Sequence, residues 1–466
     1  MEKEARVLAI DLGASSGRGI VFEYQNGIIK ETTVHRFNNG AIKKDGKYVW
    51  DIYALFSEVV KAIGIASSTV GKLSSVGIDT WGVDFGLIDK KGELIDYPRC
   101  YRDDKNAVMR EKLKDKDYEF FSLAGISIND FNTTYQLAVR NEENQDWGKV
   151  EYLLFMPELL GYMLTGEVAA EPTISSTSGF FSLQNGFDER FLKEDIPKRI
   201  FPKVKKTGEV LGYIKEEVKK ECGIDYDLPV ILTAGHDTAC AVLGVPSSEK
   251  PLYLSSGTWS LFGTIVDEPI ISKETYLNLY TNELAFDGRV RLLKNIIGMW
   301  IIQQCKKEWE EGGEITYDEI VDSARNCEKY AIIDVNSSEF FTHGNMVDKI
   351  KNYAKSHQNI ELNTMGEIAK TVYVSMAAAY KKAYDDLCSI TGKTYDRLHI
   401  IGGGANNGYL NELIAKSLNI PVWAGPIEAS ALGNALGQLI SLNVIKKGDV
   451  EKVIVASYDV KIIGAN

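Results

Sequence analysis

The chain has 466 residues, of which 44% are hydrophobic and 25% charged, and a formal net charge of −12. One hydrophobic core does not support that length, so two domains are expected, and the composition excludes a disordered chain. The acidic balance argues against non-specific binding to nucleic acid or to an anionic membrane, because either needs a basic face.

The six cysteines are widely scattered and form no C-x-x-C motif. This spacing differs from that of a zinc site or of a secreted disulfide framework. The N-terminus passes directly into strand-like residues 5–11 without the regions of a signal peptide. No apolar run approaches the roughly 18 residues of a membrane span. We therefore expect a cytoplasmic, soluble protein with no membrane partner.

The first predicted elements are strands around a turn of small residues. The apolar run 5–11 predicts a strand that ends in Asp11, and Gly13-Ala14-Ser15-Ser16-Gly17 follows it. Two β-rich runs, 18–25 and 28–37, are joined by Asn26-Gly27, which is a strong hairpin signal. The chain therefore opens with a strand, a turn and an antiparallel pair.

The next elements extend this pattern as far as residue 245. Asp51 is a candidate N-cap of a helix through about residue 66, and residues 75–78 predict a buried strand with Asp79 at its end. Residues 104–225 have a mostly helical pattern. Residues 229–234 predict another buried strand, and the small residues 239–245 suit a closely packed helix. We place a domain boundary here, giving domains 1–245 and 246–466.

The second half repeats the opening in form. Residues 252–266 read as a strand, a turn at Ser255-Ser256-Gly257-Thr258 and a second strand, and aligning Gly257 with Gly13 places Ser255 on Asp11. The elements predicted after that are helices near 295–310 and 364–390, a strand at 398–401 before Gly402-Gly403-Gly404, a helix, a strand at 421–424 and a helix near 428–441. Alternating strands and helices indicate an α/β fold, and two similar halves suggest a ligand cleft between them.

Three segments together resemble the FGGY carbohydrate kinases. They are 11–18, 255–260 and 402–407, which resemble the two phosphate loops and the adenosine loop of that family. The resemblance covers nearly the whole chain. It implies two similar domains of the actin-hexokinase-chaperone ATPase (ribonuclease H-like) superfold with an interdomain cleft. Segments 35–40, 77–85, 101–103, 236–238 and 294–298 are similar to the members of the family that act on L-rhamnulose.

The resemblance also implies ATP and Mg²⁺ as cofactors. The implied nucleotide-binding residues are Ala14, Ser15, Ser16, Gly17, Arg18, Gly257, Thr258, Gln303, Gly402, Gly403 and Gly404. Small residues let backbone N–H groups approach phosphate oxygens, and Arg18 can add charge. Asp11 would hold the metal ion, mainly through its waters. The alternatives are a plain turn for the loop and a turn-capping role for Asp11.

Asp237 is implied as the catalytic base that accepts the proton of the sugar hydroxyl. The implied sugar-binding residues are Asp79, Trp81, Gly82, Asp84, His236, Asp237, Thr238 and Asn295. Carboxylates accept hydrogen bonds from hydroxyls, and an indole can cover an apolar face of the sugar. The alternatives are a helix N-cap for Asp237, core packing for Trp81 and His236, and a solvated amide for Asn295 or Gln303. Asn295 and Gln303 are predicted to lie two turns apart on one helix.

The resulting hypothesis is an ATP-dependent kinase that phosphorylates the C1 hydroxyl of L-rhamnulose. Residues 1–245 would bind the sugar and 246–466 the nucleotide. L-fuculose, xylulose and glycerol are the alternative acceptors within the family. An ATP-driven switch or chaperone on the same superfold is an alternative of a different class. It would lack the second small-molecule pocket that residues 77–85 and 235–238 predict, and the sequence carries no signal for an oligomeric state.

Overall fold

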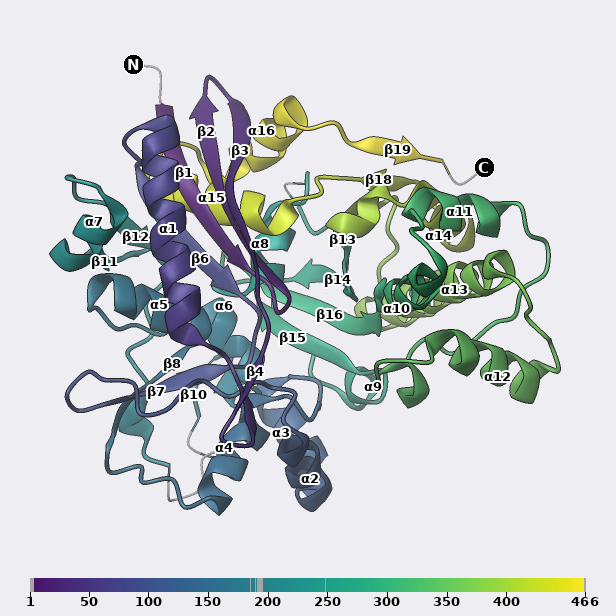
Figure 1. Cartoon of the computed structure of the whole chain (residues 1–466), viewed down its shortest axis with the longest axis horizontal. Coiled ribbons are helices and arrows are strands. Elements are labelled where there is room, and N and C mark those ends of the chain that lie inside the picture. The colour runs from purple at the N-terminus through teal and green to yellow at the C-terminus, as the bar shows by residue number, and fades with distance from the viewer. Residues whose placement is uncertain (1–3, 185, 189, 191–195, 248, 465–466) are drawn as a thin grey trace. The chain divides into compact units, whose positions relative to one another are not determined.

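The computed structural model describes residues 4–184, 186–188, 190, 196–247 and 249–464 (Figure 1). The chain forms two compact units. Unit 1 comprises Met1–Lys250, Ile265–Leu292 and Glu428–Tyr458, and unit 2 comprises Pro251–Thr264, Leu293–Ile427 and Asp459–Asn466. After the predicted boundary at residue 245, the chain therefore returns to unit 1 twice.

Unit 1 is built on a six-stranded sheet with the order β11-β12-β6-β1-β2-β3. Its strands are β1 Glu4–Leu12, β2 Ser16–Gln25, β3 Ile28–Asn38, β6 Ser75–Thr80, β11 Val210–Tyr213 and β12 Pro229–Ile231. The predicted hairpin is confirmed, because Asn26 and Gly27 at its tip have φ of 53° and 84°. Strands β1, β6 and β12 are parallel, which brings their carboxyl ends to one edge of the sheet.

Helices cover both faces of this sheet. Leu8, Ile10 and Leu12 of β1 pack in one cluster with α1 (Ile52–Val70), whereas Val7 and Ala9 pack in another cluster with α15 (Ala429–Ser441). This separation follows from the two-residue period of a strand. Figure 1 shows α1 lying along the strands of the sheet. Unit 1 therefore needs residues from both halves of the sequence to complete its core.

Helix α1 begins after Asp51, whose side chain accepts a hydrogen bond from Ala54 N at 3.1 Å, so the predicted N-cap is confirmed. Among the described residues, α1 is the one helix that is long and apolar enough to cross a membrane. Ser57, Glu58 and Lys61 interrupt its apolar residues, which pack in the core of unit 1. Packing of these apolar residues in the core accounts for the composition of α1.

The segment 104–225 contains more helix than strand, as predicted, but it also contains strands that were not predicted. Its strands include β8 (Val150–Phe155), which pairs with β7 (Phe85–Asp89). Leu154 and Leu153 of β8 lie in different core clusters, so this apolar run is buried on both faces, and pairing with a distant strand outweighs the local pattern. The other helices and small-sheet strands of unit 1 are β4 Ile42–Lys44, β5 Lys47–Val49, β9 Phe181–Ser182, β10 Gly186–Phe187, α2 Asp104–Lys112, α3 Asp117–Ala124, α4 Thr133–Glu142, α5 Met156–Thr165, α6 Pro172–Ser175, α7 Glu216–Cys222, α8 Asp237–Leu243, α9 Lys273–Leu277 and α16 Val450–Ser457, and β15 (Tyr280–Leu284) of the second large sheet also belongs to this unit.

The second large sheet has the order β15-β16-β14-β13-β17-β18-β19. Its strands are β13 Leu252–Ser256, β14 Trp259–Val266, β15 Tyr280–Leu284, β16 Val290–Ile297, β17 Leu398–Ile401, β18 Val422–Ala424 and β19 Lys461–Ile463. β13 is antiparallel to β14 and parallel to β17, as β1 is to β2 and β6. The predicted repeat of the opening is therefore present in the topology.

The helices of unit 2 are α10 Trp300–Trp309, α11 Tyr317–Arg325, α12 Met346–Gln358, α13 Met365–Thr391 and α14 Gly408–Leu418. The helix predicted from residue 295 is wrong in its first part, because Asn295 lies on strand β16. Gly298 separates strand from helix, and a side chain there would come within 2.6 Å of the Gly257 carbonyl oxygen. Asn295 and Gln303 therefore do not share a helix face.

Helices α8 and α15 approach so closely that Gly433 has no room for a side chain. A Cβ atom at Gly433 would lie 1.7 Å from the carbonyl oxygen of Cys240. We expect Gly433→Ala to lower the free energy of unfolding by more than the roughly 1–3 kcal/mol of ordinary overpacking, because the clash is with backbone. Gly448→Ala, at a glycine with nothing within 4 Å of its Cβ, is the control and should change stability by less than about 0.5 kcal/mol. Denaturant unfolding measures both, and equal stabilities would contradict this account of the packing.

Candidate active site

Three carboxylates lie at the carboxyl ends of the parallel strands of unit 1. Asp11 of β1 is in register with Asp79 of β6, and His236, just after β12, bridges to Thr80 beside Asp79. Asp237 follows at the start of α8. Each of these acidic residues was predicted from the sequence, and the parallel strands bring the three to one edge of the sheet.

Asp11 is buried and paired with Arg18 across the hairpin. The guanidinium Nη2 of Arg18 lies 2.7 Å from Asp11 Oδ2, and its Nε lies 3.2 Å from Glu428. Burial raises the pKa of Asp11, and the Arg18 charge opposes that shift only in part. The basic residue predicted to meet phosphate therefore rests between two carboxylates in this structure.

The loop between Asp11 and Arg18 is held as a small, accessible turn. Gly13 N donates to the Ser16 carbonyl oxygen at 2.9 Å, and the Asn39 side chain donates to the Gly13 carbonyl oxygen at 2.7 Å. Ser15 and Ser16 are exposed at its tip. Gly17 is packed against the Phe37 ring, where a Cβ would come within 2.3 Å. The loop can thus present backbone N–H groups to an anion.

Asp79 is fully buried behind Asp11. Its Oδ2 accepts a hydrogen bond from the Asn434 side chain of α15 at 2.6 Å, whereas Oδ1 has no hydrogen-bond partner. Burial, and next the neighbouring Asp11, raise the pKa of Asp79 well above its usual value. Gln438, one turn along α15, donates to Asn434 Oδ1 at 2.7 Å and fixes its amide. Sequence reasoning missed both amides, because no local pattern links α15 to a strand so far away in sequence.

The buried carboxylates fit a divalent cation. The charge of Asp237 contributes to the raised pKa values of Asp11 and Asp79, so the three acids are within electrostatic reach of one another. One buried oxygen, Asp79 Oδ1, lacks a partner. Among the described residues, no three His, Cys, Asp or Glu side chains lie close enough together to hold a metal ion by themselves. A cation here would therefore keep several waters, as Mg²⁺ prefers.

Asp84 lies at the centre of the loop that follows β6. Its Oδ2 accepts from the indole N–H groups of Trp50 and Trp81, at 2.6 and 3.0 Å, and its Oδ1 accepts from the Gln136 side chain at 3.0 Å. Burial raises the pKa of Asp84 to about 7 despite these donors. Only 1% of the surface of Asp84 is exposed, so its side chain holds the loop together and does not contact solvent. Trp50 and Gln136 were not predicted.

The same loop contains a strained residue. Val83 has φ of 69°, which a β-branched side chain rarely adopts. Its N–H donates to the Thr177 hydroxyl at 3.1 Å, and its carbonyl oxygen accepts from the Thr133 hydroxyl at 2.7 Å. Thr177 also lies close to Gly82, where a Cβ would approach within 3.1 Å. Trp81 is 6% exposed and lies 4.2 Å from Trp50 between ring centroids, so core packing is at least part of its role.

Residues 235–238 are held by a buried glutamate that sequence reasoning missed. Glu171 Oε2 accepts from Gly235 N at 2.9 Å, and the Thr173 hydroxyl accepts from His236 N at 3.3 Å. Helix α8 begins at Asp237, and its N-cap residue is His236, so Asp237 is not the N-cap. The Asp237 side chain is 30% exposed, and its Oδ1 accepts from the Thr238 hydroxyl at 3.0 Å. It is the accessible carboxylate of the three.

A second group of predicted residues gathers within unit 2. Gly257 N donates to the Trp259 carbonyl oxygen at 2.9 Å, as Gly13 N does to Ser16 in unit 1. Gly404 packs on Ser256, where a Cβ would meet the hydroxyl oxygen at 2.0 Å, and Thr258 Oγ1 donates to Gln303 Oε1 at 3.4 Å. Gly402 has φ of 83°, and Gly403, between Gly402 and Gly404 in the sequence, is exposed. The two glycine turns of this unit therefore lie against each other.

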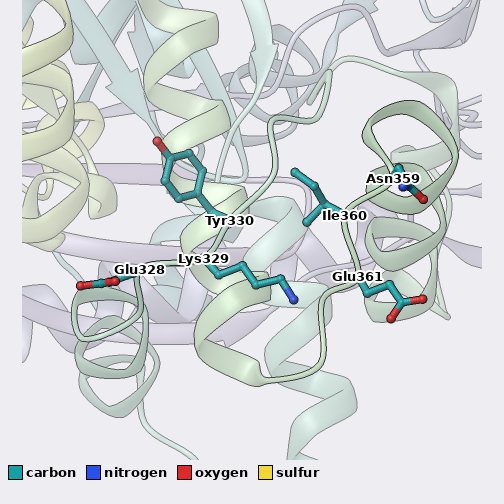
Figure 2. Close-up of a pocket in the computed structure, with 6 residues that line it drawn as sticks. All are labelled: Glu328, Lys329, Tyr330, Asn359, Ile360 and Glu361. Carbon is teal, nitrogen blue, oxygen red and sulfur yellow. The ribbon is translucent and has the colours of Figure 1, made fainter.

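An open hollow of about 580 Å³ lies elsewhere in unit 2 (Figure 2). Glu328, Lys329, Tyr330, Asn359, Ile360 and Glu361 line it. None of the residues predicted for nucleotide or sugar binding is among them. The hollow is therefore distinct from the glycine turns of unit 2.

Comparison with known proteins agrees with this arrangement. The chain matches the model of the FGGY family of carbohydrate kinases, N-terminal domain, over residues 6–244, and that of its C-terminal domain over residues 252–442. It is 36% identical to a rhamnulokinase of Bacteroides thetaiotaomicron, covering 93% of this chain and 90% of the relative. It is also 36% identical to a rhamnulokinase of Halalkalibacterium halodurans, covering 97% of each.

The fold is that of a solved gluconate kinase from Lactobacillus acidophilus, with a TM-score of 0.82 at 18% identity over 99% of this chain and 94% of that one. This agreement confirms the predicted α/β, actin-hexokinase-like ATPase superfold. With both family domains matched in order along the sequence, the chain belongs to the FGGY family of carbohydrate kinases.

Proposed function

We propose that the chain transfers the γ-phosphoryl group of ATP to the C1 hydroxyl of L-rhamnulose, giving L-rhamnulose 1-phosphate and ADP. The observation that carries the proposal is the accessible carboxylate of Asp237 at the start of α8, beside the buried acids Asp11 and Asp79. Relatives that share about a third of the sequence over nearly its full length are rhamnulokinases. This family and this geometry support a kinase that acts on a ketose.

In this proposal, Asp237 orients the C1 hydroxyl and accepts its proton as the phosphoryl group arrives. Its Oδ1 is engaged by Thr238, so Oδ2 is the oxygen that faces the hydroxyl. Asp11 would hold Mg²⁺ through water, and that ion would supply charge neutralisation on the transferred group. Asp79, which the sequence assigned to the sugar, is fully buried beside Asp11, so we assign it to the metal instead. Arg18 would exchange its contact with Asp11 for a phosphate oxygen.

We assign nucleotide binding to the loop 14–18 and to the residue group of unit 2. Gly257, Thr258 and the turn 402–404 leave the backbone uncovered by bulky side chains, and Gln303 lies beside Thr258. Such turns suit phosphate and ribose oxygens.

We assign sugar binding to His236, Asp237 and Thr238, with Asn295 of β16 as a further polar group. Trp81 would face the apolar part of a 6-deoxyketose. Because the oxygens of Asp84 already accept four hydrogen bonds, its part in sugar binding is to hold Trp81 and the turn at Gly82. A cytoplasmic location accords with the use of ATP and with the cysteines, which are free in the described residues.

The proposed acceptor is tested by ADP formation with a panel of sugars at equal concentration. We expect kcat/KM for L-rhamnulose to exceed that for L-fuculose, xylulose and glycerol by at least about tenfold, because a site that hydrogen-bonds particular hydroxyls leaves buried polar groups unpaired with the wrong sugar. A reaction without sugar is the control. Preference for another sugar would contradict the acceptor but keep the kinase, whereas sugar-independent ATP hydrolysis would favour the switch.

The catalytic base is tested by Asp237→Asn. We expect kcat to fall by roughly 10² or more, the scale of a lost general base, while ATP and sugar affinities stay within about tenfold. Asp51→Asn is the matched control, since Asp51 caps α1 and asparagine caps equally well. Turnover of the Asp237 variant near that of the control would refute the assignment.

A further inference from the structure

A buried ion pair lies directly behind His236. Arg291 of β16 is 0% exposed, and its Nη2 donates to Glu283 Oε2 of β15 at 2.8 Å. Its Nε donates to the Leu284 carbonyl oxygen at 3.0 Å. Burial alone would raise the pKa of Glu283, but the charge of Arg291 holds that pKa below its usual value. The pair is therefore charged and fixed in place.

His236 is the residue that this pair contacts. The imidazole Nδ1 lies 3.1 Å from Arg291 Nη2 and 3.2 Å from Glu283 Oε2. A guanidinium can only donate hydrogen bonds, so its hydrogen bond to Nδ1 requires a lone pair on that nitrogen. The imidazole thus accepts at Nδ1 from Arg291 and carries its ring proton on Nε2.

The other ring nitrogen faces the proposed base. His236 Nε2 lies 3.4 Å from Asp237 Oδ1, the oxygen that also accepts from Thr238. A proton on Nε2 attracts Oδ1 and leaves Oδ2 free for a sugar hydroxyl. A lone pair on Nε2 would repel Oδ1 and turn the carboxylate away.

We propose that Arg291, held by Glu283, is a positioning residue that fixes His236 in the tautomer with its proton on Nε2 and thereby orients Asp237. This inference rests on the proposed function, in which Asp237 is the base. Glu283 of β15 and Arg291 of β16 would thus position residues of the loop 235–238 without belonging to that loop. Neither residue needs to touch the sugar.

Nitrogen-15 NMR of the imidazole rings tests the tautomer in the unmodified enzyme without any turnover. The chain has five histidines, and His236→Asn identifies the signals of His236 by their loss. We expect a protonated Nε2 and an unprotonated Nδ1. A proton on Nδ1 in the neutral ring would overturn the proposal.

Kinetics test whether the pair acts through His236. Replacing Arg291 alone would leave a buried, unpaired carboxylate and endanger folding, so the variant is Glu283→Gln with Arg291→Met, which removes both charges. We expect kcat to fall about ten- to a hundredfold, the scale seen when a group that orients a functional histidine is lost, with KM for ATP changed less than about threefold. In a His236→Asn background the same pair of substitutions should lower kcat less than about threefold.

The matched control removes another carboxylate and arginine pair of unit 1. Asp117 is buried, accepts from the Tyr135 hydroxyl at 3.0 Å and lies 3.7 Å from Arg110. Asp117→Asn with Arg110→Met should leave kcat within about twofold, since neither residue contacts the loop 235–238. Equal losses of kcat with and without His236 would overturn the proposal. An unmodified enzyme that phosphorylates no sugar would instead refute the proposed function, and the NMR result would still decide the tautomer.

Discussion

The packing of α15 against α8 and the sheet of unit 1 is the constraint on which the site depends. Gly433 allows the two helices to approach until only a hydrogen atom fits between α15 and the Cys240 carbonyl oxygen. That approach brings Asn434 into reach of Asp79 and Gln438 into reach of the backbone of β1. If α15 moved outward, a fully buried carboxylate would lose its one hydrogen bond, which costs more than the bond itself contributes.

Electrostatics explains why so much of the surrounding structure consists of hydrogen-bond donors. Asp11, Asp79 and Asp84 are each buried, and burial raises the pKa of all three. Only Arg18 brings a full positive charge to Asp11, and Asp84 is balanced by neutral indole, amide and backbone N–H groups. Neutral donors stabilise a carboxylate in place without cancelling its charge. A cation bound at this edge of the sheet would lower the raised pKa values of Asp11 and Asp79 and favour their ionised forms.

Much of the site could be predicted from the sequence, because its acids end strands that local pattern reveals. Asp11 and Asp79 end apolar runs. Asp237 comes after a third apolar run, 229–234, and the pair Gly235-His236. The strands β7 and β8 and the position of Asn295 could not be predicted, since pairing with distant strands decides them. Glu171, Glu283 and Asn434 were missed for the same reason. Each contacts a site residue far away in sequence, namely Gly235, His236 and Asp79 respectively, and no spacing rule distinguishes it from a solvated side chain.

The same long-range contact has a consequence for how the protein is made. Asn434 is added to the growing chain 355 residues after Asp79. At the usual synthesis rates of about 5–20 residues per second, this interval is roughly 20–70 s. During that time β1 and Asp79 have been synthesised, but the helix that covers them has not. The apolar face of β1 that packs against α15 therefore lacks its cover until late in translation, and a chaperone could bind it throughout that interval.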